Sequence, residues 1–247
     1  MARVTKEADV RRDELLDVAL DLCVEVGFEA MSVEQVTSAA GVAKGTFYHY
    51  FASKQELLAQ LVSRFGDQLF DHLESEMRAV DGDALTRLGA LMNISATWKL
   101  ERLNAAMAYL PFLFKEENYT LRYRLYTEWL ERLRPLVLEI VTQGTRDGTF
   151  AVDDPGATTT VLLTLWIDGG NRMWESAIAA SDFADSMMAG GAAILAAQER
   201  ILRAPDGSLD LMASIEPGAL DGVRATLVEQ GRGFIGPDSR SDRGRHT

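Results

Sequence analysis

The stretch SVEQVTSAAGVAKGTFYHYFASK, residues 32–54, contains a capped helix start, a glycine stop and a second, aromatic helix. Ser32 and Gln35 form a capping-box pattern, in which the hydroxyl and amide side chains satisfy free backbone donors at the start of a helix. Gly41 is expected to end that helix, because glycine tolerates the left-handed conformation that often follows a last turn. A second short helix is expected over 44–51. Two short helices joined by a glycine turn have the dimensions of a helix-turn-helix.

The second helix of this pair has two chemically different faces, because successive residues are about 100° apart around a helix axis. Phe47 and Phe51 share one face, flanked by Tyr50, and are expected to pack on the first helix. Gly45 and His49 point the opposite way. Small, hydroxyl-bearing and basic side chains suit a DNA groove, where they contact phosphates and approach base edges. Geometry alone leaves two alternatives open, a DNA-binding helix and an ordinary αα-hairpin whose exposed side has no function.

The segment GVAKGTFYHYFASKQELL, residues 41–58, resembles the recognition-helix segment of the TetR family of bacterial transcriptional regulators. The family pattern is glycine, apolar, variable, Ser or Lys, Gly, Thr, apolar, Tyr, variable, Tyr or His, and Phe, with a Lys one turn later. The resemblance covers roughly residues 9–65. It implies six DNA-contacting residues, to which His49 is added by its outward direction. The predicted DNA-binding set is Lys44, Gly45, Thr46, Tyr48, His49, Tyr50 and Lys54.

The charge of the chain does not by itself indicate DNA binding, because the formal net charge is −12. Residues 1–54 contain six Lys/Arg and nine Asp/Glu. The basic residues lie in the N-terminal arm and around the second short helix, whereas most acidic residues lie along the helix expected over 10–26. The distribution of charge therefore matters more than its sum. Glu34 departs from the family pattern, since relatives often place a basic or neutral residue there, and it weighs against a base contact from the first helix.

The remaining composition is that of an ordinary globular protein, with 47% apolar and 25% charged residues. No run of about 18 apolar residues predicts a membrane span, and the N-terminus has no hydrophobic signal region. A cytoplasmic protein without a membrane partner is expected. The single cysteine, Cys23, lies on the apolar face of a predicted helix and is expected to be a core residue. No catalytic constellation, metal-ligand spacing or cofactor motif is found, so no enzyme activity, metal or cofactor is predicted.

Apolar periodicity predicts an all-α protein without a sheet. The resemblance implies an N-terminal three-helix helix-turn-helix head and a larger C-terminal helical body. A long helix over 54–80 is expected to connect head and body. The predicted divisions are an N-terminal arm over 1–8, a DNA-binding domain over 9–56, a ligand-binding and dimerisation body over 57–230 and a disordered tail over 231–247.

Apolar residues at steps of three and four predict several further helices. They are expected at about 10–26, 85–94, 98–110, 121–144, 157–176, 183–202 and 217–230. Pro111 is expected to end one helix and Pro135 to kink another. The helices over 157–176 and 183–202 combine glycine pairs with broad apolar faces. That combination fits either a four-helix interface in a twofold dimer or burial inside one subunit.

Aromatic residues are concentrated between Trp98 and Trp129, which hold eight of the chain's 20. The cluster has two interpretations, ordinary core packing and a largely apolar ligand pocket with a few polar groups. The resemblance implies a pocket in this body for a small, largely apolar effector. The predicted ligand-binding residues are Arg102, Asn104, Met107, Phe114, Tyr123, Trp166 and Asn171.

The resemblance implies a homodimeric transcriptional regulator that binds double-stranded operator DNA, most often as a repressor that the effector releases. One alternative is a helical small-molecule-binding protein whose DNA role is vestigial. A third is an α-helical enzyme, for which the sequence nominates no catalytic residues.

Overall fold

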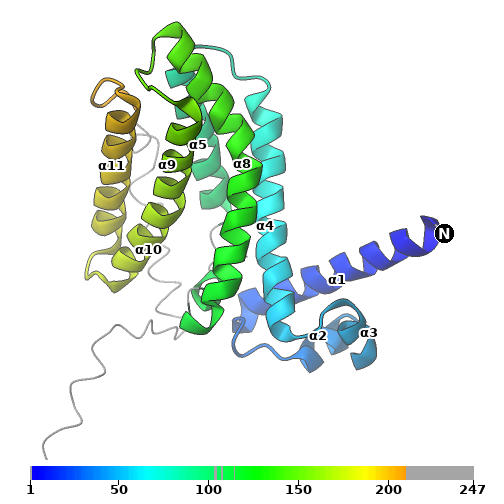
Figure 1. Cartoon of the computed structure of the whole chain (residues 1–247). Helices are drawn as coiled ribbons and strands as arrows, with labels where there is room; N and C mark the ends of the chain where they lie inside the picture. Colours follow the sequence, from blue (N-terminus) through cyan, green and yellow to red (C-terminus); the bar gives the residue numbers. More distant parts are fainter. Residues whose placement is uncertain (1, 103–104, 107, 114, 210–247) are drawn as a thin grey trace, which may run out of the picture. The chain divides into compact units, whose positions relative to one another are not determined.

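The computed structural model describes residues 2–102, 105–106, 108–113 and 115–209 (Figure 1). Within these ranges every regular element is a helix, which confirms the predicted all-α class. The chain divides into two compact units. Unit 1 contains residues 1–78 and 95–133, and unit 2 contains residues 79–94 and 134–247. Unit 1 therefore extends beyond the predicted DNA-binding domain and includes the whole of the long connecting helix.

Unit 1 begins with four helices, α1 (Ala2–Val26), α2 (Val33–Ala39), α3 (Lys44–Tyr50) and α4 (Lys54–Met77) (Figure 1). It also holds the second part of α5 (Ala84–Glu101), α7 (Leu110–Leu113), the 3-10 turn η1 (Glu116–Asn118) and the first part of α8 (Tyr119–Asp147). The helix-turn-helix is thus confirmed, and α4 ends three residues before its predicted end.

Three boundaries differ from the sequence-based expectation. The predicted arm over 1–8 is helical from Ala2 and continues α1. Helix α5 runs without interruption to Glu101, because no Pro or Gly lies between residues 94 and 98 to end it. Pro111 is the second residue of α7 rather than the end of a helix. Proline is tolerated there because the first-turn N–H groups of a helix have no intrahelical partner.

The core of unit 1 is formed by apolar side chains from α1 to α4 together with residues 108–125. Phe47 and Phe51 are fully buried in it, as their shared face on the helix predicts. Cys23 is also fully buried, which confirms its assignment to the core. The aromatic segment contributes Tyr109, which is nearly inaccessible to solvent. Burial raises the pKa of its phenol group far above the ordinary value.

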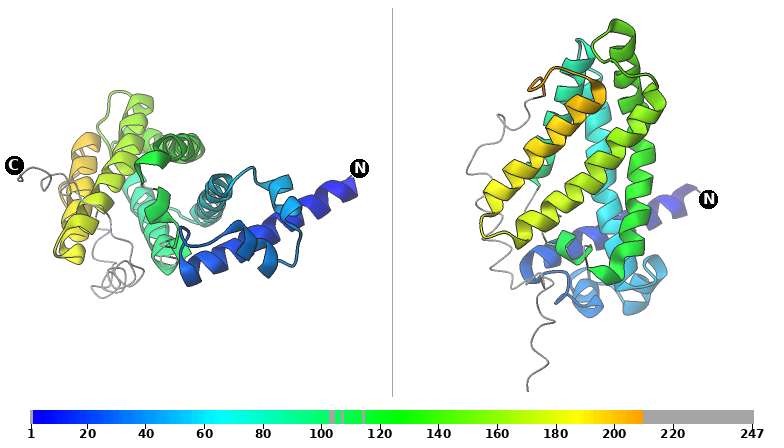
Figure 2. Two further views of the ribbon diagram at one scale, coloured as in Figure 1. Left: turned by 90° about the horizontal axis from the view of Figure 1, so that it is seen from below. Right: turned by 60° about the vertical axis from the view of Figure 1, so that its left-hand side comes forward.

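Unit 2 contains the first part of α5, the second part of α8, α9 (Pro155–Thr164), the π-helical turn η2 (Leu165–Gly169), α10 (Gly170–Ala179) and α11 (Phe183–Leu202). The bounds of α11 agree with the predicted 183–202. The helix predicted over 157–176 is longer and contains the π-helical turn, which the periodicity did not indicate. Figure 2 shows α9 and α10 beside α11, and α10 and α11 are in contact. Helix α8 continues through Pro135.

Neither a helix long and apolar enough to cross a membrane nor a group of three or more His, Cys, Asp or Glu side chains placed to hold a metal ion occurs in the described part of the chain. The helix predicted over 217–230 and the tail predicted over 231–247 lie outside the described residues.

Candidate functional site

Short-range hydrogen bonds fix the start of α2 and the turn between α2 and α3. The hydroxyl of Ser32 accepts the N–H of Gln35 at 3.2 Å, and the amide side chain of Gln35 accepts the N–H of Ser32 at 2.8 Å. This is the predicted capping box. Gly41 has a φ of 65°, which lies in the left-handed region and confirms its role as the helix stop. The N–H of Val42 then donates to the carbonyl of Thr37 at 2.9 Å and closes the turn that leads to α3.

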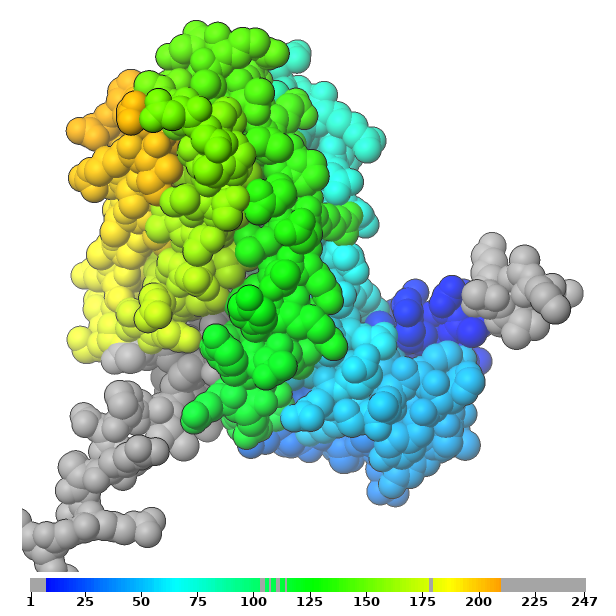
Figure 3. Space-filling view, in the orientation of Figure 1, coloured from blue at the N-terminus to red at the C-terminus, as the bar shows by residue number. Residues whose placement is uncertain are grey.

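Four of the predicted DNA-binding residues of α3 are exposed, whereas Phe47 on the same helix is buried. Lys44, Gly45 and His49 are exposed, and the side chain of Tyr48 is 51% exposed. Figure 3 shows the segment that contains α2 and α3 at the surface of unit 1. A Cβ atom built on Gly45 would meet no heavy atom within 4 Å. The fold therefore leaves open space above this position and does not itself require a glycine there.

Two of the predicted DNA-binding residues have contacts inside the subunit. Tyr50 is half-buried against the unit 1 core. The ammonium group of Lys54 donates to the carbonyl oxygen of Glu29 at 2.9 Å and lies 4.8 Å from the centre of the Phe28 ring. Partial burial lowers the pKa of Lys54. These contacts of Lys54 connect the start of α4 to the loop between α1 and α2.

The same loop is also joined to the segment that follows α5. The rings of Phe28 and Phe112 have centroids 4.8 Å apart, and the N–H of Phe28 donates to the carbonyl of Ala108 at 3.3 Å. Lys115 forms an ion pair of 2.8 Å with Glu29. We call these contacts between residues 28–29 and 108–115 the loop junction. Sequence reasoning missed it, because its two sides lie about 80 positions apart and follow no shared pattern.

The seven predicted ligand-binding residues do not form one described site. Asn104, Met107 and Phe114 lie outside the described residues. In unit 1, the guanidinium group of Arg102 lies 4.4 Å from the centre of the Trp98 ring, and the side chain of Tyr123 is 66% exposed. The remaining two, Trp166 and Asn171, belong to unit 2.

Trp166 lies in the π-helical turn η2, and its indole N–H donates to the side-chain oxygen of Gln198 at 2.6 Å. Gln198 is fully buried on α11, and its amide nitrogen donates to the sulfur of Met92 at 3.1 Å. Asn171 is half-buried on α10. Trp166 therefore takes part in a partly buried polar chain that connects η2 to α5.

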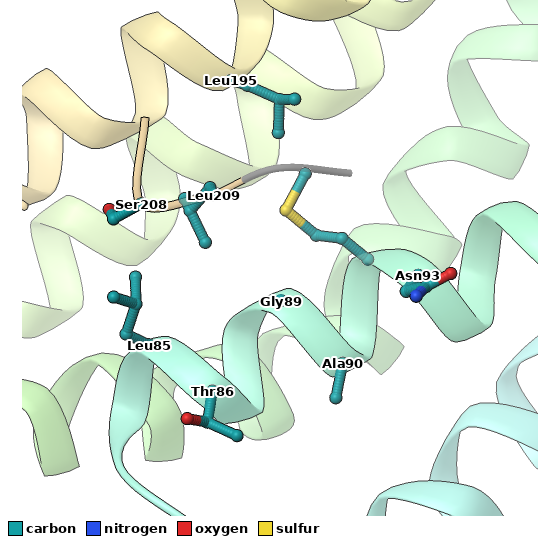
Figure 4. A pocket seen from close by; sticks show the side chains of 9 residues that line it. Leu85, Thr86, Gly89, Ala90, Asn93, Leu195, Ser208 and Leu209 are labelled. Atoms are coloured by element: carbon teal, nitrogen blue, oxygen red, sulfur yellow. The ribbon is translucent and has the colours of Figure 1, made fainter. Parts of the chain in front are cut away.

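Unit 2 contains a cavity of about 360 Å³ between α5, α11 and the turn that follows α11 (Figure 4). It is lined by Leu85, Thr86, Gly89, Ala90, Met92, Asn93, Leu195, Ser208 and Leu209. None of these residues belongs to the predicted ligand-binding set. Among the described lining residues, Gly89 carries a sequence signal, because it is a glycine inside an otherwise regular helical pattern.

Known proteins resemble this chain both locally and over most of its length. A family model described as "Bacterial regulatory proteins, tetR family" matches residues 15–61. The HTH-type transcriptional repressor KstR2 of Rhodococcus jostii (strain RHA1) is 32% identical over 147 residues, which are 58% of this chain and 69% of the relative. KstR2 of Mycobacterium tuberculosis (strain CDC 1551 / Oshkosh) is 30% identical over 159 residues, 62% of this chain and 76% of the relative.

Solved structures agree in fold. A TetR-family transcriptional regulator from Pectobacterium atrosepticum superimposes with a TM-score of 0.62 at 18% identity, covering 81% of this chain and 98% of that chain. RolR, solved without ligand, gives a TM-score of 0.53 at 18% identity over 83% of this chain and 98% of that chain. At these identities the structures support the fold alone. With the helix-turn-helix in place and two repressors similar over more than two thirds of their length, the chain belongs to the tetR family of bacterial regulatory proteins.

Proposed function

We propose that this protein is a homodimeric repressor that binds double-stranded operator DNA through the outer face of α3 and is released by a small, largely apolar effector. Membership of the family supports the DNA-binding role. The repressors among its relatives support the sign of regulation. The other parts of the proposal are supported by particular contacts in each unit.

The observation that carries the DNA-binding surface is the open space at Gly45. An αα-hairpin without a function would gain stability from alanine at this position, since glycine weakens a helix. A glycine here allows the backbone of α3 to approach a base edge closely. Lys44 and Thr46 flank it at the start of the helix, where the side chains of a recognition helix meet bases.

Tyr48 lies one turn beyond Lys44 and is suited to hold a phosphate. Lys54, although bonded to Glu29, keeps two further N–H donors on its ammonium group for a second phosphate contact. The two residues would fix the position of α3 on the duplex without reading its sequence.

We propose that the loop junction transmits effector binding to the α2–α3 pair and so causes release of DNA. The α1–α2 loop leads directly into α2 and, through Phe28 and Glu29, contacts residues 108–115. This segment lies within the aromatic cluster, between Trp98 and Trp129, in which the effector site is predicted. A displacement there would therefore act on the loop that positions the α2–α3 pair.

Dimerisation is proposed through α10 and α11. The two glycine groups in these helices behave differently within one subunit. A Cβ on Gly190 would lie 2.5 Å from Cγ of Met173, so Gly190 serves close packing of α10 and α11 inside the subunit. A Cβ on Gly170 would meet nothing within 4 Å, which leaves room there for a second copy. Native mass spectrometry should give twice the 27.2 kDa of one chain. A monomer would overturn this part of the proposal.

The DNA-binding surface is tested by Lys44→Ala and Tyr48→Ala in a gel shift with the intergenic DNA beside the protein's own gene. Each variant should weaken binding at least tenfold, on the order of 1–3 kcal/mol for a good specific contact. Because Lys44 is placed at a base edge, Lys44→Ala should also relax the sequence preference of binding.

The matched control is Tyr119→Ala, which removes a tyrosine of similar exposure at the start of α8. It should bind the DNA as the parent protein does. Unchanged affinity in both α3 variants would show that α3 is not the DNA-binding surface.

A further inference from the structure

We propose that Arg132 of α8 is a positioning residue for the DNA-binding pair, because it fixes the direction of α4 and, through α4, the place of α3. Arg132 would thereby set how the two copies of α3 in a dimer meet the two halves of an operator, a role that rests on the proposed function. Its contacts with α4 lie within unit 1 alone.

The first half of α4 belongs to the same core as α3. Leu57, Leu58 and Val62 of α4 are fully buried there together with Phe47 of α3. Between the end of α3 and the start of α4 lie only residues 51–53. Because the two helices share one packed core and a short connection, α3 follows any change in the direction of α4.

The second half of α4 lies against the first part of α8 (Figure 1). The indole of Trp129 fills the space beside Gly66, since a Cβ on Gly66 would lie 2.2 Å from Nε1 of that indole. The rings of Trp129 and Phe70 meet edge to face, with centroids 6.2 Å apart. This contact sets the distance between the two helices. It defines their direction poorly, because apolar attraction is non-directional.

Arg132, one turn beyond Trp129, makes directional contacts with three carboxylates of α4. Nη1 lies 3.0 Å from Oδ1 of Asp67, Nε lies 3.4 Å from Oε1 of Glu74, and Nη2 bonds Asp71. The three acids follow one another on one face of α4 over about 10 Å, at a rise of about 1.5 Å per residue. A planar guanidinium holds its acceptors in fixed directions. The guanidinium of Arg132 therefore defines the direction of α4 beside α8.

These ion pairs serve direction more than stability. The three carboxylates are exposed, and exposed ion pairs contribute little to the free energy of unfolding. Carboxylates three and four residues apart on a helix also repel each other, and here one guanidinium faces three of them. Removal of Arg132 would leave that repulsion without its central cation. Helix α4 would then gain freedom of direction, while its apolar contact with Trp129 would remain.

The direction of α4 matters for DNA because a twofold dimer reads two half-sites at once. The second half-site adds affinity only if the two copies of α3 have the spacing of the half-sites. A fixed α4 should therefore give the parent protein a strict preference for one spacing, whereas a loosely directed α4 should give a weak one. Affinity for a single half-site depends on α3 and should not change.

The first test measures the direction of α4 without DNA, in the full-length protein. Spin labels are attached to Ala39→Cys of α2 and Thr127→Cys of α8, two exposed positions in unit 1, while the native Cys23 is fully buried and protected from labelling. The distance distribution from double electron–electron resonance should be narrow in the parent protein. It should be about twice as wide in Arg132→Gln, because repulsion among the carboxylates is then uncompensated.

The matched control is Arg124→Gln on the same helix. Arg124 is paired with Glu128 of α8 itself, so its removal should leave the distribution unchanged. Arg132→Lys keeps the charge but replaces the planar fork by a point charge, and should narrow the distribution only in part. If Arg132→Gln does not fold, as judged by thermal unfolding, Arg132→Lys takes its place. A distribution as narrow as that of the parent in the folded variant would overturn the proposal.

The second test uses the operator mapped within the intergenic DNA beside the protein's own gene, and the same operator with one base pair inserted between its half-sites. The insertion should weaken binding at least about tenfold for the parent protein but no more than about threefold for Arg132→Gln. Both proteins should bind DNA with one half-site equally well. A variant that merely lost stability would bind all three DNAs more weakly by the same factor.

Together the two measurements separate the role of Arg132 from the proposed function. A wider distribution in Arg132→Gln with an unchanged spacing preference would overturn Arg132 as a positioning residue for α3. A parent protein that binds no operator would contradict the proposed function. The spin-label distances would then still decide whether Arg132 directs α4.

Discussion

The α2–α3 pair in unit 1 and the cavity in unit 2 are assembled in opposite ways. The pair comes from one continuous stretch, residues 32–54, and its geometry is set by a capping box, a glycine stop and a short aromatic helix. The cavity is assembled from residues 85–93 and from residues 195 and 208–209, two groups that are more than 100 positions apart. The first kind of site is determined by local chemistry, whereas the second depends on how distant helices pack.

Glycines show the same difference. A Cβ on Gly45 would meet no atom within 4 Å, so no contact inside the protein requires a glycine there. We propose that the missing side chain leaves room for DNA. A Cβ on Gly144 would lie 2.2 Å from Cδ2 of Phe150 and 2.8 Å from Cβ of Ala84. Gly144 is therefore required by packing inside unit 2. The same residue type thus has a proposed functional role in one unit and a structural role in the other.

The largest effect on stability is expected where α3 enters the core. Phe47→Ala should lower the free energy of unfolding by about 3–5 kcal/mol, because it removes a fully buried ring. Tyr48→Ala, one residue further, should change it by no more than about 0.5 kcal/mol, because half of that side chain is exposed. Urea unfolding monitored by circular dichroism measures both. Equal effects would show that the assignment of the two faces of α3 is wrong.

Alanine substitutions at Gly144 and Gly45 should change stability by smaller amounts and in opposite directions. Gly144→Ala should destabilise the protein by about 1–3 kcal/mol, because the new methyl group overlaps Phe150. Gly45→Ala should stabilise it by up to roughly 0.5 kcal/mol, since alanine favours the helix and meets no neighbour.

Gly45→Ala should lower the affinity for operator DNA, whereas folded Gly144→Ala should leave that affinity unchanged. Thermal unfolding and fluorescence anisotropy with labelled operator DNA separate the two effects. A Gly45→Ala variant with full affinity would remove the argument for close approach at that position.

Much of the fold could be predicted from the sequence, because it is determined by neighbours along the chain. The capping box at Ser32, the stop at Gly41 and the bounds of α11 follow from residue types within a few positions of each helix end. The buried faces of α1 to α4 follow from periodicity.

The cavity and the loop junction could not be predicted in this way. Nothing around Ser208 indicates that its hydroxyl is buried beside α5, and nothing around Phe28 indicates that its ring meets Phe112. The π-helical turn at Trp166 was missed for a related reason. Its extra residue is accommodated by contacts with α11, including the bond to Gln198, rather than by a local sequence signal.

The turn of the cavity depends on one buried carboxylate. Glu199→Gln should destabilise the protein by about 1–2 kcal/mol, because the amide keeps one acceptor and leaves one of the two backbone N–H groups without a partner. Hydrogen exchange at the Gly207 and Leu209 amides should become faster, since the carboxylate that accepts both N–H groups is lost. The capping variant Ser32→Ala, of similar cost to stability, should change exchange at these two amides much less. Equal acceleration of exchange in both variants would indicate a general effect of stability.

The smallest effect is expected from the chemistry of the helix caps. The N–H of Thr86 donates to the carboxylate of Asp83 at 2.8 Å, and this bond holds the pKa of Asp83 below its ordinary value of 3.8. A carboxyl group whose pKa is lowered by folding stabilises the folded state above its ordinary pKa. That contribution is lost as the pH falls through the lowered value. The α2 cap in unit 1 uses the hydroxyl of Ser32, which does not titrate in this range.

Acid should therefore weaken the start of α5, which lines the cavity, before it weakens the start of α2. Proton–nitrogen NMR spectra recorded from about pH 5 downward should show the Thr86 amide moving with a midpoint below 3.8, while the Gln35 amide moves far less. Asp83→Asn keeps an acceptor for the N–H of Thr86 but cannot ionise, so it should abolish the movement at Thr86. A Thr86 amide that still titrates in this variant would mean that another carboxylate is responsible. The cap would then not distinguish the acid response of the two units.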